Sequence, residues 1–109
     1  MSGTSAKSIS VEATTALVKS LIAQAVYYDG DPLTLRSELK LKDPPLSYDD
    51  GVWFLQLRYL VERTFHFQLL SDEELRRAHD WSFRDSFTVG MIIDRVHSKL
   101  LESDAHLAV

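Results

Sequence analysis

Apolar residues recur every three or four positions along most of this chain, the spacing that places them on one face of an α-helix. The first such stretch begins at Ser10 or Val11. Its apolar stripe consists of Leu17, Val18, Leu21, Ile22, Ala25 and Val26. Residues 29–32, Asp-Gly-Asp-Pro, are expected to end the helix, because glycine and proline both interrupt helical backbone.

A long connection from Leu33 to Tyr48 separates the first helix from the second. Connections of this length usually have a function or a structure of their own. We expect its leucines to attach it to the core: Leu33, Leu35, Leu39 and Leu41. The pair Pro44-Pro45 excludes a helix just before the next element, because proline disfavours helical backbone at the residue before it.

The second helix has the clearest pattern and runs from Asp50 to Leu69. Its core face consists of Phe54, Leu57, Val61 and Phe65, widened by Leu60 and Thr64. Ser47 with Asp50, or Asp49, can cap the free amides at its start. Asp49-Asp50 could also be read as paired carboxylates for acid–base work. Capping explains them better, since no nucleophile or second base is nearby in sequence.

Two further helices follow. Residues 71–74, Ser-Asp-Glu-Glu, form a capping box with acids at the positive end of the helix dipole. The apolar residues of this short third helix are Leu75 and Ala78, with Trp81 and Phe83 beyond. The last helix runs from Thr88 or Val89 to about Leu101 and buries Val89, Ile92, Ile93, Val96 and Leu100.

Together these elements predict an all-α fold, a four-helix bundle over residues 10–101 with a long loop between helices one and two and a short third helix. We expect residues 1–9 to form a flexible N-terminal tail and residues 102–109 a frayed C-terminus. Neither an internal repeat nor the period-two alternation of a strand is present.

Composition fits one small globular domain and disfavours several kinds of protein. The chain has 109 residues, 16 acidic and 12 basic side chains and a net charge of -4, which disfavours nucleic acid as a partner. Without cysteine it has no disulfide and no thiolate chemistry. No apolar run approaches the roughly 18 to 20 residues of a membrane span, and the Ser-rich start lacks the apolar stretch of a signal peptide. We therefore expect a cytoplasmic protein.

Two short motifs resemble those of acyl carrier proteins. Asp50-Gly51-Val52 stands at the head of the second helix, where that family shows Asp-Ser-Leu. The apolar run and acidic cap that follow are Leu55, Leu57, Val61, Phe65, Phe67, Leu69 and Ser71-Asp72-Glu73. Residues 88–90, Thr-Val-Gly, resemble the motif that opens the family's last helix. The resemblance covers roughly residues 10–101 and implies the family's four-helix fold.

Gly51 is the main departure from that family. In acyl carrier proteins a serine at this position carries 4′-phosphopantetheine through its hydroxyl. Gly51 has no side-chain oxygen, so no phosphodiester can form there, and we expect no cofactor. The segment before Thr88, which holds Arg76, Arg77, Trp81 and Arg84, is also longer than usual for the family. The face of helix two is less acidic, which weakens electrostatic steering toward basic partners.

The resemblance without the attachment serine suggests a non-catalytic docking or regulatory module that acts through helix two. Its protein partner could be a biosynthetic enzyme. The expected partner-binding residues are Asp50, Gly51, Val52, Trp53, Gln56, Tyr59, Glu62 and Arg63. Two interpretations of Trp53 stay open: it belongs to an exposed aromatic patch, or the connection from Leu33 to Tyr48 folds over it and buries it.

Two other functions are considered. The chain could be a divergent acyl or peptidyl carrier modified at another serine such as Ser47, although Ser47 is better explained as a cap. The bundle interior could also hold a fatty acyl ligand non-covalently.

Nothing in the sequence requires an enzyme or a metal. The histidines are scattered: His66, His79, His97 and His106. No two of them lie at i, i+4 with a carboxylate, so we expect no metal site. A basic cluster consists of Arg76, Arg77 and Arg84. It is best explained as a solvated face with Glu73 and Glu74.

Overall fold

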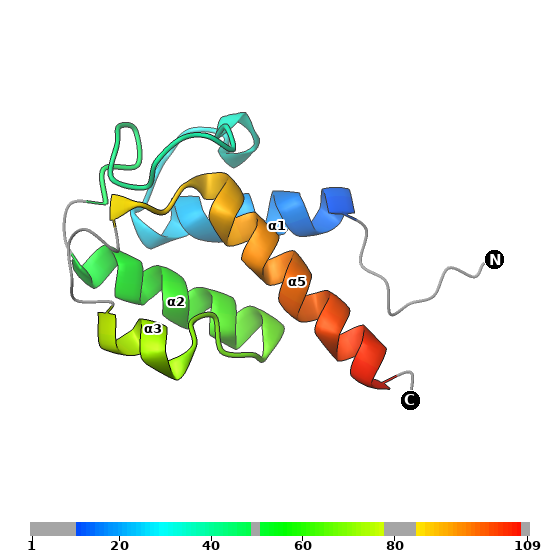
Figure 1. Ribbon diagram of the computed structural model, residues 1–109. Coiled ribbons are helices and arrows are strands. Elements are labelled where there is room, and N and C mark those ends of the chain that lie inside the picture. The colour runs from blue at the N-terminus through cyan, green and yellow to red at the C-terminus, as the bar shows by residue number, and fades with distance from the viewer. Residues whose placement is uncertain (1–10, 49–50, 78–84, 108–109) are drawn as a thin grey trace.

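The computed structural model describes residues 11–48, 51–77 and 85–107 (Figure 1). This part of the chain contains four α-helices, one short 3-10 helix and no strand. The elements are α1 (Val11–Ala25), η1 (Pro32–Thr34), α2 (Gly51–Phe65), α3 (Asp72–Arg77) and α5 (Val89–Leu107). The prediction of an all-α bundle with a long first connection and a short third helix is confirmed.

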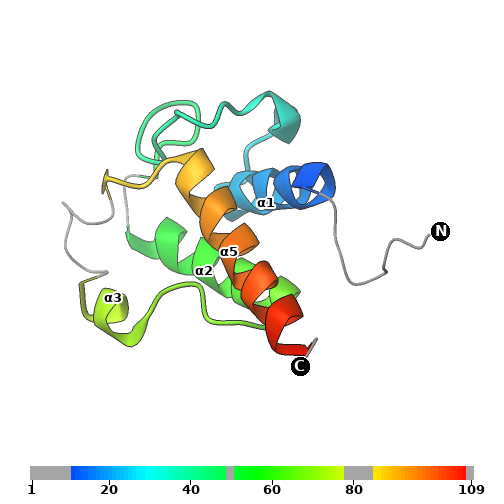
Figure 2. The same ribbon diagram turned by 45° about the vertical axis from the view of Figure 1, so that its right-hand side comes forward.

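The core lies where α1 packs against α2 and α5. α5 crosses the other two helices obliquely (Figures 1 and 2). The fully buried side chains at its centre are Val18 and Ile22 of α1, Leu57 and Val61 of α2, and Ile92 and Val96 of α5. All six belong to the apolar stripes that the sequence predicts. Burial of each contributes about 1.5–3 kcal/mol to folding. Thr64, predicted to widen the core face of α2, is instead exposed in the last turn of that helix.

α1 ends before the Asp-Gly-Asp-Pro run that was expected to stop it. Tyr27 has left-handed backbone with φ of 56°, the conformation that glycine usually supplies at the end of a helix. The N–H of Tyr28 donates to the carbonyl of Ala23 at 2.9 Å, and the N–H of Tyr27 donates to that of Gln24 at 3.2 Å. This pair of hydrogen bonds is a Schellman motif, so the helix stop is made by the backbone around a tyrosine.

The long connection is attached to the bundle by some of the leucines predicted to do so. Leu35 and Leu41 are buried and Leu39 is half-buried, as expected. Leu33 is 60% exposed, so the prediction was wrong for this residue. Leu33 lies in η1, which begins at a proline and buries none of its three residues.

Tyr48, the last described residue of the connection, is tied to α1. Its buried hydroxyl donates a hydrogen bond to the carbonyl of Ile22 at 2.7 Å. The N–H of Val26, which would bond Ile22 in a continuing helix, donates instead to the carbonyl of Ala23 at 3.2 Å. Burial raises the pKa of Tyr48 far above its ordinary value, so the hydroxyl keeps its proton and stays a donor.

The middle of the connection runs alongside the chain that enters α5. The N–H of Leu41 donates to the carbonyl of Phe87 at 3.0 Å, and the N–H of Val89 donates to that of Leu39 at 2.9 Å. Between these bonds lies an isolated antiparallel bridge that joins Lys40 and Thr88. These contacts satisfy backbone groups that irregular chain would otherwise leave unpaired.

The start of α5 explains the Thr-Val-Gly motif. The hydroxyl of Thr88 accepts the N–H of Met91 at 3.2 Å and so caps the helix. Gly90 donates its N–H to the carbonyl of Ser37 at 2.8 Å. A side chain at position 90 would meet Ser37, because a Cβ built there lies 3.0 Å from its carbonyl oxygen and from its Cβ. Glycine therefore suits the close approach of the two segments, and a larger residue would require Ser37 to shift.

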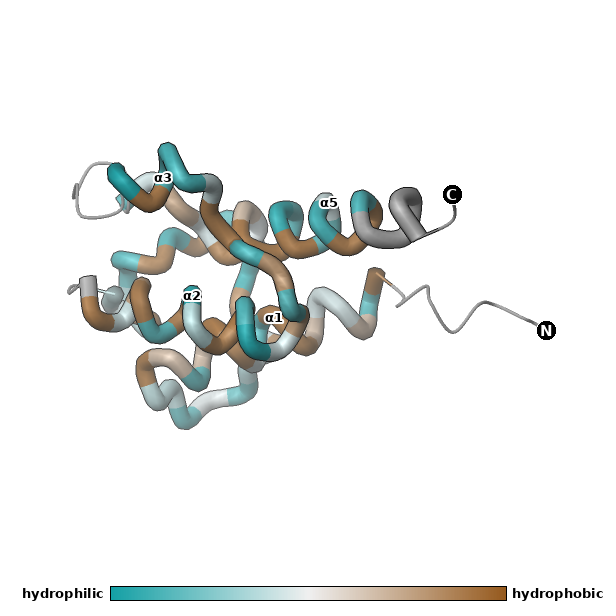
Figure 3. Tube along the Cα trace, turned by 90° about the horizontal axis from the view of Figure 1, so that it is seen from below, coloured by the Kyte–Doolittle hydropathy of each residue, from teal (hydrophilic) through white to brown (hydrophobic). Residues whose placement is uncertain are grey.

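α5 continues to Leu107, beyond the end predicted at Leu101 and through much of the segment expected to fray. Hydrophobic and hydrophilic residues alternate in bands along it (Figure 3). Leu101 is exposed, so the helix goes on past the part that its apolar residues bury. The predicted apolar residues Ala78, Trp81 and Phe83 lie outside the described residues.

Candidate functional site

The outer face of α2 carries three large hydrophobic side chains that the fold leaves uncovered. Val52 is 59% exposed, Leu55 is 56% exposed and Tyr59 is 55% exposed. They follow one another at i, i+3 and i+7, so they form one stripe on the helix. Gln56 and Arg63 are exposed beside them. We call these five residues the outer face of α2.

Half of the eight predicted partner-binding residues therefore lie together. Val52, Gln56, Tyr59 and Arg63 belong to the outer face. Gly51 is the first residue of α2, and Asp50 lies outside the described residues. Glu62 is not part of the outer face: its side chain is half-buried and accepts the N–H of Leu69 in the chain that follows α2.

Trp53 takes neither of the two positions considered for it. It is half-buried and packs against the core, with its ring edge-on to Tyr27 at a centroid distance of 6.4 Å. Tyr27 follows the end of α1, so this ring contact comes from the chain just after that helix. Trp53 therefore lies on the side of α2 between the core and the outer face, while Tyr27 is itself 79% exposed.

Leu55 is the member of this face that sequence reasoning missed. It was placed in the apolar run of helix two together with true core residues. Its position relative to Leu57 could have shown that it is exposed. Residues i and i+2 of a helix lie about 200° apart around the axis, so Leu55 and Leu57 cannot both face the core. Leu57 is fully buried, and Leu55 is exposed.

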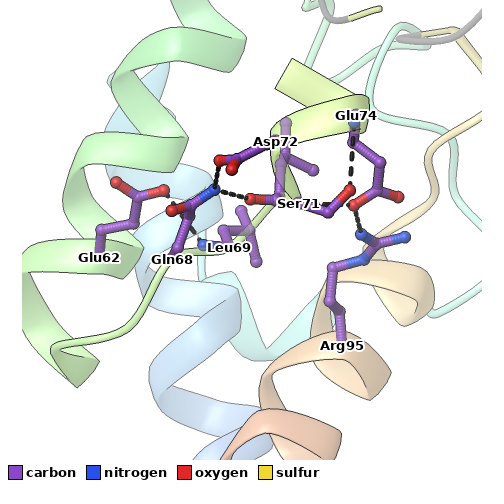
Figure 4. Close-up of polar contacts among 8 residues, drawn as sticks. Glu62, Gln68, Leu69, Ser71, Asp72, Glu74 and Arg95 are labelled. Carbon is purple, nitrogen blue, oxygen red and sulfur yellow. Dashed lines mark hydrogen bonds and ion pairs between the residues drawn. The ribbon is translucent and has the colours of Figure 1, made fainter. Parts of the chain in front are cut away.

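At the other end of α2 the chain makes a polar junction with α3 (Figure 4). α2 ends at Phe65, earlier than the predicted Leu69, and His66 takes left-handed backbone with φ of 61°. The N–H of His66 donates to the carbonyl of Glu62 at 2.9 Å. The carboxylate of Glu62 accepts the N–H of Leu69 at 3.1 Å and pairs with Arg58 at 3.4 Å. One glutamate thus organises the end of the helix.

α3 is held by the capping box that the sequence predicts. The N–H of Glu74 donates to the hydroxyl of Ser71 at 3.1 Å, and the N–H of Ser71 donates to the carboxylate of Glu74 at 2.9 Å (Figure 4). The side-chain amide of Gln68 donates to the carbonyl of Leu70 and to Asp72. The Ser71 hydroxyl thus satisfies one of the free amides at the start of a helix of only six residues, and Gln68 ties the preceding chain to that start.

Glu74 also joins α3 to α5 through an ion pair with Arg95. The hydrogen bond from Arg95 is the main reason that the pKa of the Glu74 carboxyl lies below its ordinary value, and partial burial opposes it. The guanidinium of Arg95 lies 5.5 Å from the centre of the Phe87 ring. Phe87 in turn contacts Phe54 of α2, with ring centroids 5.3 Å apart.

A hollow of about 370 Å³ opens beside this junction. Arg58 and Glu62 of α2, Leu75 of α3 and three residues of the intervening chain line it: His66, Phe67 and Gln68. The Nε–H of Arg58 is buried and has no hydrogen-bond acceptor, although Glu62 Oε2 lies 3.4 Å from it in an ion pair. Phe67 stacks on Phe65 with centroids 5.8 Å apart, which gives the hollow an aromatic wall.

Other candidate chemistry is not brought together in the described part of the chain. Among those residues no group of three or more His, Asp or Glu side chains could hold a metal ion. Ser47 is exposed and precedes α2, with its N–H bonded to the carbonyl of Asp43 at 2.9 Å. His79 and Arg84 lie outside the described residues. None of the described helices is long and apolar enough to cross a membrane.

Comparison with known proteins gives no match to a family model, a curated protein or a solved structure.

Proposed function

We propose that this chain is a non-catalytic, acyl-carrier-like docking or regulatory module that binds a protein partner through the outer face of α2. One observation carries the proposal: Val52, Leu55 and Tyr59 are each more than half exposed and lie on one helical stripe. Folding gains little from side chains in that position. Helices that bind in a groove of a partner use anchors at this i, i+3, i+7 spacing, and tyrosine is enriched among interface hot spots.

The charge on this face indicates what kind of partner fits it. Arg63 is exposed and makes no ion pair with another described residue, whereas Glu62 is paired with Arg58. The outer face is therefore positive in a chain whose net charge is -4. The expected partner is a cytoplasmic protein, such as a biosynthetic enzyme, with an apolar groove for the stripe and a carboxylate that reaches Arg63.

The test begins with a photo-cross-linking residue in place of Gln56, which lies within the face without being one of its anchors. The partner identified in this way is purified, and its affinity is measured by calorimetry. The double variant Leu55→Ala, Tyr59→Ala should bind at least about 10-fold more weakly, the effect of losing about 1.4 kcal/mol or more at a hot spot. The matched control Val11→Ala, Leu101→Ala removes two hydrophobic side chains that are exposed elsewhere and should bind normally.

Equal affinity of the double variant and the control would show that the face is not the docking surface. Light scattering of the native chain supplies a second check. A dimer that the double variant abolishes would make a second copy the occupant, and the proposal of a separate partner would then be wrong.

The acyl-carrier-like part of the proposal has its own test. The native chain and a Gly51→Ser variant are incubated with coenzyme A and a promiscuous phosphopantetheinyl transferase, and their intact masses are measured. The proposal expects the variant alone to gain the arm, because the native chain has no hydroxyl at the start of α2. A gain by the native chain would point to another serine such as Ser47, and a gain by neither would count against the resemblance.

A further inference from the structure

We propose that the hollow between α2 and α3 is a binding site for a small organic carboxylate that carries an apolar group. The site lies at the opposite end of α2 from Val52 and Leu55 and does not depend on the docking function. Its volume of about 370 Å³ falls at the lower end of the range for small-molecule sites, about 300–1,000 Å³.

The first observation concerns Arg58. Its Nε–H is buried without an acceptor, so the ion pair with Glu62 leaves the hydrogen bonds of the guanidinium unmet. No hydrogen bond joins its terminal nitrogens to another described residue either. Guanidinium groups with several free donors bind carboxylates through two parallel hydrogen bonds. An acceptor with two oxygens fits this arrangement better than a single carbonyl.

The second observation concerns the negative charge of Glu62, which also lines the hollow. Its Oε2 accepts the N–H of Leu69, which stabilises the carboxylate, and its 3.4 Å contact with Arg58 is made at Nε and not at the terminal nitrogens. The donors of Gln68 are likewise taken, by Leu70 and Asp72. Arg58 is therefore the main group in the hollow with donors to offer a ligand, and His66 is exposed at its edge.

The third observation concerns the walls. Phe67 and Leu75 are half-buried hydrophobic side chains that line the hollow and pack against the core. They favour a ligand with a hydrocarbon or aromatic part over an inorganic anion, which would gain nothing from apolar surface. Benzoate combines a carboxylate with one aromatic ring, and its neutral isostere benzamide has the same shape without the charge.

The test is a titration of the native chain with benzoate, followed by nitrogen–proton NMR, in which the arginine Nε–H groups give their own signals. The Arg58 signal should shift and saturate. Benzamide should bind at least about 10-fold more weakly, since it lacks the charge that pairs with the guanidinium. Sulfate should also bind more weakly than benzoate, and equal binding would overturn the proposed role of the apolar walls.

Three variants complete the test. Arg58→Gln should weaken benzoate binding at least about 10-fold. Arg58→Lys keeps the charge and the pairing with Glu62 but loses the planar fork, so it should bind with intermediate strength. Arg63→Gln removes an arginine from the same helix outside the hollow and should change the affinity less than twofold. Equal losses in Arg58→Gln and Arg63→Gln, or no saturable shift in the native chain, would overturn the proposal.

Discussion

The two ends of α2 differ in what the rest of the protein does with their surfaces. At the first turns, large hydrophobic side chains are exposed on the outer face. At the last turns, polar side chains are drawn into contacts with the following chain and α3. Large hydrophobic side chains are usually buried, and charged side chains are usually exposed to solvent. The two ends of α2 each depart from one of these tendencies. The first end is therefore suited to a partner, and the second end to holding the fold together.

The largest effect is expected from a pair of leucines on opposite sides of α2. Leu57→Ala should lower the free energy of unfolding by about 2–5 kcal/mol, because Leu57 is fully buried and its loss leaves a cavity. Leu55→Ala should change it by less than about 0.5 kcal/mol. Urea denaturation followed by circular dichroism measures both. A cost for Leu55→Ala similar to that for Leu57→Ala would show that the outer face takes part in folding.

The polar junction should be the next most sensitive place. Glu62→Ala removes the acceptor of the Leu69 N–H and the partner of Arg58, and should cost about 1–3 kcal/mol. The adjacent control Arg63→Ala, on the exposed side, should stay within about 0.5 kcal/mol. If both variants unfold at the same urea concentration as the native chain, the contrast between the ends of α2 does not hold.

The ion pair that joins α3 to α5 should give the junction a dependence on pH. Glu74→Gln keeps the hydrogen bond to the N–H of Ser71 but removes the negative charge that pairs with Arg95. It should lower the free energy of unfolding by about 1 kcal/mol at neutral pH. The pKa of Glu74 is lowered in the folded state, so its contribution is complete above the ordinary value of 4.5 and disappears as the pH falls through the lower folded pKa. The difference between variant and native chain should therefore shrink in acid. A difference that stays constant with pH would rule out a role for the charge.

The smallest effect is expected where α2 ends. His66→Gly should raise the free energy of unfolding by up to about 1 kcal/mol, because glycine relieves left-handed backbone at φ of 61°, although it also adds entropy to the unfolded chain. His66→Ala, which keeps the unfavourable backbone, should bring no gain. Thermal unfolding of the two variants separates backbone strain from any contribution of the imidazole.

The sequence was sufficient for the features that depend on neighbouring residues. The apolar stripes place Val18, Leu57 and Ile92 in the core, and the capping box at Ser71 and Glu74 forms as predicted. These features follow from helical spacing and from hydrogen bonds between residues three apart, both of which can be read from the chain.

The features that were missed depend on tertiary contacts. Tyr27 and His66 have left-handed backbone, but neither is a glycine, so the sequence does not indicate this conformation. The need for glycine at position 90 arises from Ser37, which is far away in sequence. Arg58 could not be distinguished from other helix-surface arginines until Glu62 and the chain after α2 were seen around it. The sequence therefore predicted four residues of the outer face and, at the junction, the capping box of α3, but not the hollow beside Arg58.

The pairing of the long connection with the entrance to α5 has a consequence for the order of folding. The bonds of Leu41 to Phe87 and of Val89 to Leu39 join segments separated by α2 and α3. Closing so long a loop costs entropy before any contact repays it, so these bonds should form late, after the helices between them have collapsed. Once formed, they make the connection and the first turn of α5 one cooperative unit. In hydrogen exchange, the amides of Leu41 and Val89 should open together, as slowly as helical amides, although Leu41 lies in irregular chain.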